Sequence, residues 1–190
     1  MIYFMLHGFA SATPNESSQF FEENVLGPGD RLVNLNYRFN EYAAEDLMDG
    51  IDSVIDSMTD EYTFVGCSLG GYMAQYMARM YMGKAIVINP AVIPYEDLSR
   101  FLGVNTNYRT AEVFDLTDDD VKSFKHFAVK PGIVPTLVLL DMGDELLSSA
   151  DTVKHFAGKA VIRTFEGGSH RFEHMPEAVG FIREFANTLV

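Results

Sequence analysis

Residues 66–70 read Gly-Cys-Ser-Leu-Gly, a G-x-S-x-G pattern that stands between an apolar run and a helical pattern. In this setting a serine occupies a sharp turn from a strand into a helix, and its hydroxyl is exposed as a nucleophile. Gly66 and Gly70 lack a Cβ, which lets the strand and the helix approach closely around the turn. Ser68 is therefore the candidate nucleophile. A glycine-rich turn without chemistry is the alternative interpretation.

A serine hydroxyl is a weak nucleophile unless a base activates it, and the base needs an acid to orient it. Along chains of this kind the order is Ser, then Asp or Glu, then His. Asp144 follows a predicted strand and a glycine downstream of Ser68, so we expect it to be the acid. Asp141, at the strand end, and Glu145, just after Asp144, remain alternatives.

The candidate base is His170, which follows the last predicted strand in the loop Glu166-Gly167-Gly168-Ser169-His170. Two glycines give this loop the freedom to bring an imidazole over the sheet. His174, four residues further on, is the alternative base. The other three histidines are expected to be structural or exposed.

Catalysis of acyl transfer also needs donors for a developing oxyanion. One expected donor is the backbone N–H of Leu69, the residue after the nucleophile. The other is the N–H of Phe9, in the segment Leu6-His7-Gly8-Phe9 that follows the first predicted strand. Cys67 precedes the turn, and we expect it to be a small buried thiol.

Apolar runs alternate with helical patterns, which predicts an α/β fold with a mostly parallel central sheet of about six strands flanked by helices. Helical periodicity is found over 41–58, 69–82 and 176–189, and the methionines of 69–82 are expected to fill the core. The expected strands are Ile2–Leu6, Arg31–Asn36, Tyr62–Val65, Lys84–Ile88, Thr136–Leu140 and Ala160–Phe165.

The rhythm breaks between the strands that are expected at 84–88 and 136–140. We expect residues 91–134 to form a small lid or cap of two or three short helices, one of them capped by Thr117, within a single domain over 1–190. Five aromatic side chains of this segment are candidates either for an apolar acyl pocket or for the core of the lid: Tyr95, Phe101, Tyr108, Phe114 and Phe124.

The net charge is −13, from 14 basic and 27 acidic residues. Such a surface repels phosphate backbones and anionic lipids, so nucleic acid is excluded as an expected partner. No basic cluster is visible that would receive a strongly anionic substrate. One cysteine allows no internal disulfide, and no apolar stretch reaches the ~18 residues that span a membrane, so we expect a cytoplasmic protein. No metal or organic cofactor is expected, and no oligomeric state is predicted.

Taken together, these motifs resemble the α/β-hydrolase superfamily and, within it, the small bacterial YqiA-type esterases. The likeness covers nearly the full length and includes Leu6-His7-Gly8-Phe9, Gly66-Cys67-Ser68-Leu69-Gly70-Gly71-Tyr72, Asn89-Pro90-Ala91-Val92, Leu102-Gly103, Gly143-Asp144-Glu145 and the loop ending at His170. Two positions depart from the family, because Cys67 stands where serine is usual and Ser169 where asparagine is usual.

The resemblance implies hydrolysis of carboxylic esters or thioesters by Ser68, Asp144 and His170 through an acyl-enzyme. We expect a small-molecule substrate, a short- to medium-chain acyl ester. Three other reactions of a serine hydrolase stay open: hydrolysis of peptides, of lactones or of acyl-CoA, the last opposed by the negative charge of the chain. The alternative from another class is a catalytically silent α/β-hydrolase fold that serves as a binding protein.

Overall fold

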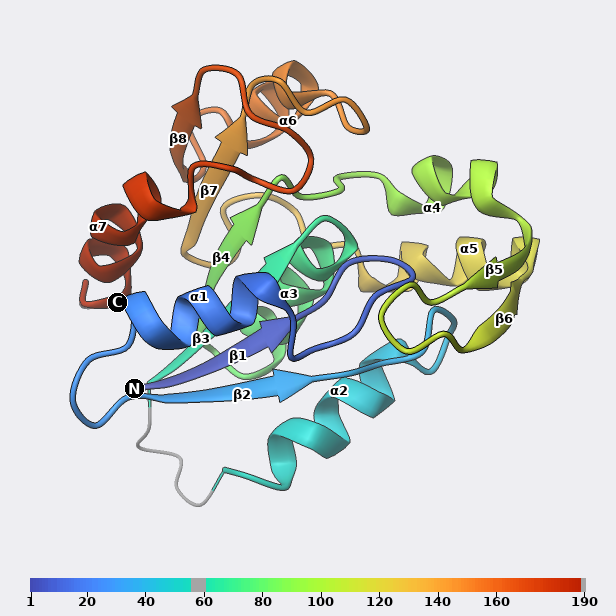
Figure 1. Cartoon of the computed structure of the whole chain (residues 1–190), viewed down its shortest axis with the longest axis horizontal. Coiled ribbons are helices and arrows are strands. Elements are labelled where there is room, and N and C mark those ends of the chain that lie inside the picture. Colours follow the sequence, from blue (N-terminus) through green and yellow to red (C-terminus); the bar gives the residue numbers. More distant parts are fainter. Residues whose placement is uncertain (56–60, 189–190) are drawn as a thin grey trace.

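The main sheet of the protein has six strands, all parallel, in the order β2-β1-β3-β4-β7-β8. The computed structural model in Figure 1 describes residues 1–55 and 61–188. All six expected strands are present, which confirms the predicted α/β class. Their bounds are β1 (Ile2–Leu6), β2 (Arg31–Leu35), β3 (Tyr62–Cys67), β4 (Lys84–Ile88), β7 (Thr136–Asp141) and β8 (Val161–Phe165).

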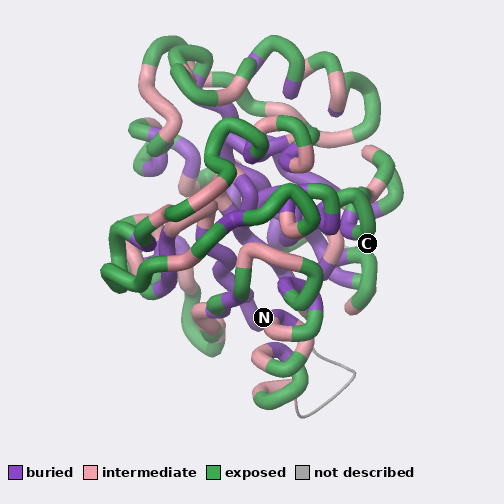
Figure 2. The backbone as a smooth tube through the Cα atoms, turned by 90° about the vertical axis from the view of Figure 1, so that its right-hand side faces the viewer, coloured by how far each residue is buried: buried purple, intermediate pink, exposed green. Residues whose placement is uncertain are grey.

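The central strands are buried on both faces of the sheet. Successive side chains of a strand point to opposite faces, and in β1 Phe4 and Leu6 join one hydrophobic cluster while Tyr3 and Met5 join the other. Every residue of β1, β4 and β7 is buried. Figure 2 shows the buried stretches running through the middle of the molecule. This two-sided burial explains why these strands are read as nearly continuous apolar runs.

Helices cover both faces. Side chains of α2 (Ala43–Asp52), α3 (Leu69–Met80) and α6 (Ser149–Phe156) enter one hydrophobic cluster, and those of α1 (Glu16–Asn24) and α7 (Met175–Ala186) enter the other. The helix predicted over 41–58 is shorter, and its Met58 lies outside the described residues, as does Leu189 of the predicted 176–189 helix. No expectation covered α1, although a capping box marks its start, with Asn15 and Ser18 bonding each other's backbone N–H.

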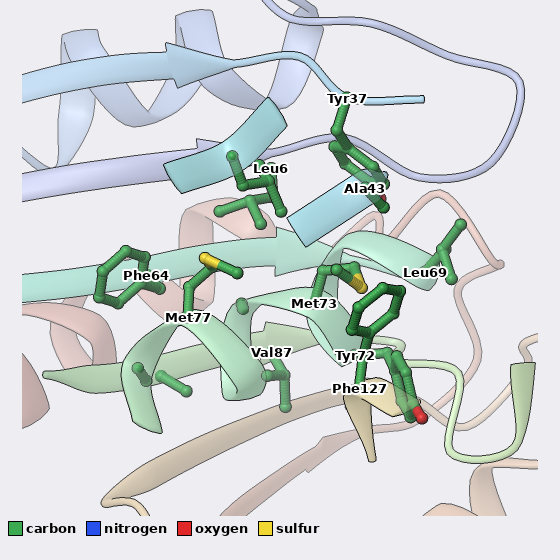
Figure 3. Close-up of a cluster of buried hydrophobic side chains, with 14 of the residues drawn as sticks. Leu6, Tyr37, Ala43, Phe64, Leu69, Tyr72, Met73, Met77, Val87 and Phe127 are labelled. Carbon is green, nitrogen blue, oxygen red and sulfur yellow. The ribbon is translucent and has the colours of Figure 1, made fainter. Parts of the chain in front are cut away.

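The methionines of the 69–82 segment divide into two pairs. Met73 and Met77 are fully buried and pack with Leu6 and Phe64 in the same hydrophobic cluster. Figure 3 shows both between α3 and the strands. Met80 and Met82, at the carboxyl end of the helix, are 49% and 86% exposed. The expectation that these methionines fill the core is therefore right for the first pair and wrong for the second.

The 91–134 segment lies beyond the carboxyl ends of β1 and β2 (Figure 1). It contains two short α-helices and two 3₁₀ helices where two or three short helices were expected, and Thr117 caps one of them through a bond from the Asp120 N–H. A two-stranded antiparallel hairpin was not expected. Its strands have four residues each, Gly-Val-Asn-Thr and Val-Phe-Asp-Leu, and neither alternates strictly between apolar and polar side chains. The elements are α4 (Pro94–Asp97), η1 (Leu98–Phe101), β5 (Gly103–Thr106), β6 (Val113–Leu116), α5 (Asp118–Ser123) and η2 (Phe124–Phe127).

Hydrogen bonds anchor this segment to the rest of the molecule. The hairpin turn docks on the loop after β1, where Asn107 Nδ2 donates to the Ser11 carbonyl over 2.8 Å. On the other side, the Tyr72 hydroxyl of α3 donates to the Phe124 carbonyl over 2.7 Å. Among the described residues, no helix has the length and the apolar character needed to cross a bilayer.

The start of α3 packs against the loop after β1 without room for a side chain at residue 70. A Cβ on Gly70 would lie 2.6 Å from the His7 carbonyl oxygen and still closer to that of Leu6. A Cβ on Gly66 would likewise overlap the backbone of Gly70. The two glycines therefore allow the strand, the helix and the loop to meet at residue 68.

We predict that Gly70→Ala lowers the free energy of unfolding by ~3 kcal/mol, the upper end of the usual cost of overpacking, because backbone atoms cannot move aside as side-chain ends can. The matched control is Gly180→Ala on α7, where an added Cβ meets nothing within 4 Å. That change should raise the free energy of unfolding by ~0.5–1 kcal/mol through helix propensity. Urea unfolding measures both. Equal effects of the two substitutions would contradict the packing argument.

Candidate active site

Ser68 occupies the turn between β3 and α3 with φ of 55° and ψ of −123°. This conformation is uncommon for a residue with a side chain, so the surroundings must hold it. The Ser68 N–H donates to the Ile88 carbonyl over 3.0 Å, and its carbonyl accepts the Ala91 N–H over 3.1 Å. The turn is thus tied on both sides to the end of β4. This is the strand-turn-helix setting that the sequence pattern predicts.

His170 and Asp144 are joined as expected. His170 Nδ1 lies 2.8 Å from Asp144 Oδ2, and the side chains are 18% and 2% exposed. Because a carboxylate can only accept, the imidazole donates its Nδ1–H, which leaves Nε2 as the basic nitrogen. Asp144 Oδ1 accepts the N–H groups of Leu146 and Leu147. Burial acts to raise the pKa of Asp144, but the bonds from His170, Leu147 and Leu146 outweigh it and hold that pKa below its usual value.

The alternative acid and the alternative base bind each other. His174 Nδ1 lies 2.7 Å from Asp141 Oδ1, and Asp141 is fully buried. The third candidate acid, Glu145, accepts the backbone N–H of His170 over 3.0 Å rather than its imidazole. Of the three carboxylates considered, only Asp144 therefore contacts the His170 ring.

Asn89, at the end of β4, links these loops. Its Oδ1 accepts the Asp141 N–H over 2.9 Å. Its Nδ2 donates to the carbonyls of Ser169 (2.9 Å) and His170 (3.2 Å). The residue has a positive φ of 41°. We assigned Asn89 no role from the sequence, although it begins the Asn-Pro-Ala-Val motif that marks the family. Its role appears only in the folded chain, where the loops that Asn89 links lie next to one another.

A cavity of ≈ 580 Å³ brings the predicted residues together, since Ser68, His170, Phe9 and Leu69 all line it. Within the described chain, no hydrogen bond joins the Ser68 hydroxyl to His170. Of the five aromatic candidates, Phe101 and Tyr108 line this cavity, whereas Phe124 is fully buried. The 91–134 segment therefore contributes side chains both to the wall of the cavity and to the hydrophobic core.

The backbone N–H groups predicted as oxyanion donors are available. The Phe9 N–H donates no hydrogen bond within the described part of the chain. Leu69 is the first residue of α3, where the helix offers no carbonyl to its N–H. His7 supports this loop. Its ring stacks on Tyr37 with centroids 4.5 Å apart, and its Nδ1 lies 2.9 Å from the Gly8 carbonyl.

Two other side-chain types at the cavity bear on its chemistry. Cys67 lines it and is partly buried; burial raises the pKa of its thiol to about 11, so the thiol remains protonated at neutral pH. Arg100, Arg109 and Arg171 also line the cavity. This corrects the expectation that the chain has no basic cluster. Arg100 and Arg109 both belong to the 91–134 segment, and only the folded chain brings Arg171 to the same cavity.

No group of three or more metal-ligating side chains occurs among the residues that the structure describes. The expectation that no metal or organic cofactor takes part stays a prediction.

Comparisons with known proteins agree with this architecture, and the fold is that of an α/β hydrolase. The chain belongs to the Uncharacterised protein family UPF0227, whose model matches residues 1–187. This membership confirms the family resemblance of the motifs. Among curated relatives, the UPF0227 protein YcfP of Escherichia coli O9:H4 (strain HS) is 25% identical over 181 residues, which cover 95% of this chain and 96% of YcfP.

Solved structures resemble the chain over nearly its whole length. Est1E from Butyrivibrio proteoclasticus superimposes with a TM-score of 0.71 at 16% identity, covering 97% of this chain and 86% of that one. A monoacylglycerol lipase from Paleococcus ferrophilus gives a TM-score of 0.70 at 15% identity, covering 97% and 93%. At such identities the likeness establishes the fold alone.

We predict that the buried neutral ring of His7 makes stability depend on pH. Burial lowers its pKa to about 4, whereas an unfolded histidine titrates near ~6.5. As pH falls through this window only the unfolded chain gains the proton, so the stabilisation is complete above ~6.5 and is lost toward ~4. At pH 5 the loss amounts to ~2 kcal/mol.

The measurement is urea unfolding of the wild type and of His7→Asn at pH 7.5 and pH 5. Carboxylates that titrate in both proteins cancel in the comparison. The stability advantage of the wild type should shrink by ~2 kcal/mol at the lower pH. An unchanged advantage would show that the folded state accepts the proton at His7.

Proposed function

We propose that the protein is a serine hydrolase that cleaves carboxylic esters or thioesters through an acyl-enzyme. The observation that carries this proposal is that Ser68 and His170 line one cavity while the buried carboxylate of Asp144 orients the His170 ring. A nucleophile, a base and an orienting acid, drawn from three separate loops, are the parts that such a reaction needs.

In the proposed first step the Ser68 hydroxyl oxygen attacks the carbonyl carbon, and His170 Nε2 takes its proton. Asp144 stays ionised and stabilises the imidazolium. The carbonyl oxygen becomes an oxyanion that the N–H groups of Phe9 and Leu69 receive. Each such donor is worth ~3 kcal/mol in a comparable enzyme.

Collapse of this intermediate breaks the bond to the alcohol or thiol, which leaves with the proton from His170. Water then attacks the acyl-serine and gives its proton to His170, which returns it to Ser68 as the acid departs. No step needs a metal or an organic cofactor. The hydrogen bond between Ser68 and His170 has to form in the substrate complex, as catalytic hydrogen bonds often tighten there.

We further propose that residues 91–134 act as the lid over the acyl group. Leu98 and Phe101 of this segment line the cavity. The Phe101 ring also packs against Phe9 from the loop after β1, with centroids 5.3 Å apart. Apolar side chains of this kind in the cavity wall suit contact with a short- to medium-chain acyl group.

The silent binding protein is the competing function, and a fluorophosphonate probe separates the two. We predict stoichiometric labelling of Ser68 in the wild type and none in Ser68→Ala, because only a base-activated serine reacts.

Asp144→Asn should slow ester turnover by ~10³–10⁴-fold, because it removes the acceptor that sets the imidazole tautomer. Peptide mass mapping and aryl ester hydrolysis are the measurements.

Asp151→Asn is the matched control, since Asp151 is an exposed carboxylate in the first turn of α6, outside the cavity. It should label and turn over like the wild type. Wild-type protein that is folded but unlabelled at neutral pH would support the silent fold. Near-full activity of Asp144→Asn would transfer the role of the acid to Asp141 or Glu145.

A further inference from the structure

The buried carboxylate of Asp141 takes no part in the proposed reaction and does not line the cavity. It is nevertheless fully buried and accepts three hydrogen bonds. Oδ1 binds His174 Nδ1 at 2.7 Å, and Oδ2 accepts the N–H groups of Ser169 (3.2 Å) and Glu173 (2.7 Å). A buried charge with this set of partners is costly to leave unpaired.

The two N–H groups bracket His170. Ser169 directly precedes it and Glu173 follows three residues later, so one carboxylate oxygen holds both ends of the turn that carries the imidazole. Gly168 makes room for this contact, because its Cβ would overlap the Asp141 carboxylate and lie 2.9 Å from Asp141 Cβ. Gly168 has a φ of +70°. The two-glycine loop thus allows the turn to pack closely against the Asp141 carboxylate.

His174 completes the arrangement. Its ring stacks on Phe165 at the end of β8, with centroids 5.3 Å apart and planes 14° from parallel. From there its Nδ1–H occupies the remaining oxygen of Asp141. We propose, on the basis of the proposed function, that Asp141 and His174 form a second acid–imidazole pair that positions the loop carrying His170 and does not touch the substrate.

The test compares His174→Phe, which keeps a ring against Phe165 but removes the donor, with His174→Asn, whose side-chain N–H can replace Nδ1–H. Turnover is expressed per active site titrated by the fluorophosphonate probe. We expect His174→Phe to lower kcat per titrated site by about tenfold to a hundredfold with KM nearly unchanged, the scale of a misplaced catalytic group. His174→Asn should recover most of this loss.

The control is His126→Ala, an exposed histidine of the 91–134 segment that does not line the cavity and should behave as the wild type. If His174→Phe fails to fold, His174→Ala makes the same comparison. A loss of thermal stability or of titratable sites, with kcat per site unchanged, would overturn the proposal and leave a purely structural role. Wild-type protein without labelling or turnover would instead refute the proposed function itself.

A separate observation concerns charge. Arg100 and Arg109 of the 91–134 segment and Arg171 of the loop after β8 line the cavity of a chain whose net charge is −13. Within the described residues none of them forms an ion pair. Arg109 Nε donates to the Pro14 carbonyl (3.2 Å) and Arg100 Nη2 to that of Leu146 (3.3 Å), and the Arg100 guanidinium also lies over the Phe101 ring. Within the described part of the chain, their other guanidinium N–H groups donate no hydrogen bond.

Among the described residues, two carboxylates, Glu16 and Asp97, line the same cavity. Burial raises the pKa of Asp97, with Arg100 acting in the opposite direction. Basic groups therefore outnumber acidic ones here, against the trend of the chain. Guanidinium groups bind carboxylate and phosphate oxygens in paired hydrogen bonds. We infer, again on the basis of the proposed function, that the ester substrate carries a negatively charged group that these arginines receive.

Two matched ester pairs test this inference. 4-Nitrophenyl hydrogen adipate against 4-nitrophenyl hexanoate places the charge on the acyl side, and 4-acetoxybenzoate against its methyl ester places it on the alcohol side. One anionic member should exceed its neutral partner by about tenfold in kcat/KM, the factor that one charge-assisted hydrogen bond supplies. The preference should weaken in added salt.

Glutamine substitution of Arg100, Arg109 and Arg171 together should abolish the preference, while Arg79→Gln, at an exposed site outside the cavity, should keep it. Faster hydrolysis of both neutral esters, or a preference that survives the triple substitution, would overturn the inference. Labelling of Ser68 by the probe is unaffected by either result, so the proposed function stands or falls separately.

Discussion

The structure depends on one backbone turn, in which Ser68 adopts a positive φ between a buried strand and a buried helix. A side chain in that conformation is tolerated only where surrounding contacts determine it. Here the Ser68 backbone is bonded to Ile88 and Ala91, and α3 starts against the carbonyls of the loop after β1. The same contacts that hold the turn bring the Phe9 loop, the Leu69 N–H and the nucleophile together at the carboxyl ends of β1 and β3.

A second constraint orders the other edge of the site. Two carboxylates three residues apart, Asp141 and Asp144, each bind a histidine from one loop. Both are withdrawn from water, so each must find donors within the protein. Backbone N–H groups and the two imidazoles supply these donors, and Asn89 closes the connection to β4. Burial of charge thereby gives this loop a defined shape, which a glycine-rich segment would otherwise lack.

The balance of charge at the cavity differs from that of the whole chain. The chain as a whole is strongly acidic, yet its cavity is lined by three arginines and two carboxylates. Net charge governs encounter at long range, where salt screens it. Recognition inside a cleft depends on the few groups that face the ligand, where low-dielectric walls focus their field. The −13 total therefore does not describe the charge that a ligand meets inside the cavity.

Local sequence determined the strands, the nucleophile turn and the nominated acid and base, because period, glycine placement and chain order are properties of neighbouring residues. Apolar runs placed all six strands of the sheet, and Gly66 and Gly70 marked the turn. Local sequence did not predict α1, whose apolar pattern is weak, or the hairpin at 103–116, whose strands lack a strict alternation of apolar and polar residues. Met80 and Met82 were expected in the core, but they lie where α3 leaves the sheet.

The tertiary structure decided which acid binds which histidine. The sequence favoured Asp144 over Asp141 and Glu145, and His170 over His174, but it left these alternatives open. The choice is a matter of a few ångströms and depends on how two loops pack across the sheet. The linking role of Asn89 and the gathering of the arginines have the same origin. Such contacts join residues tens of positions apart, and a linear pattern carries no information about distances that only the packed sheet creates.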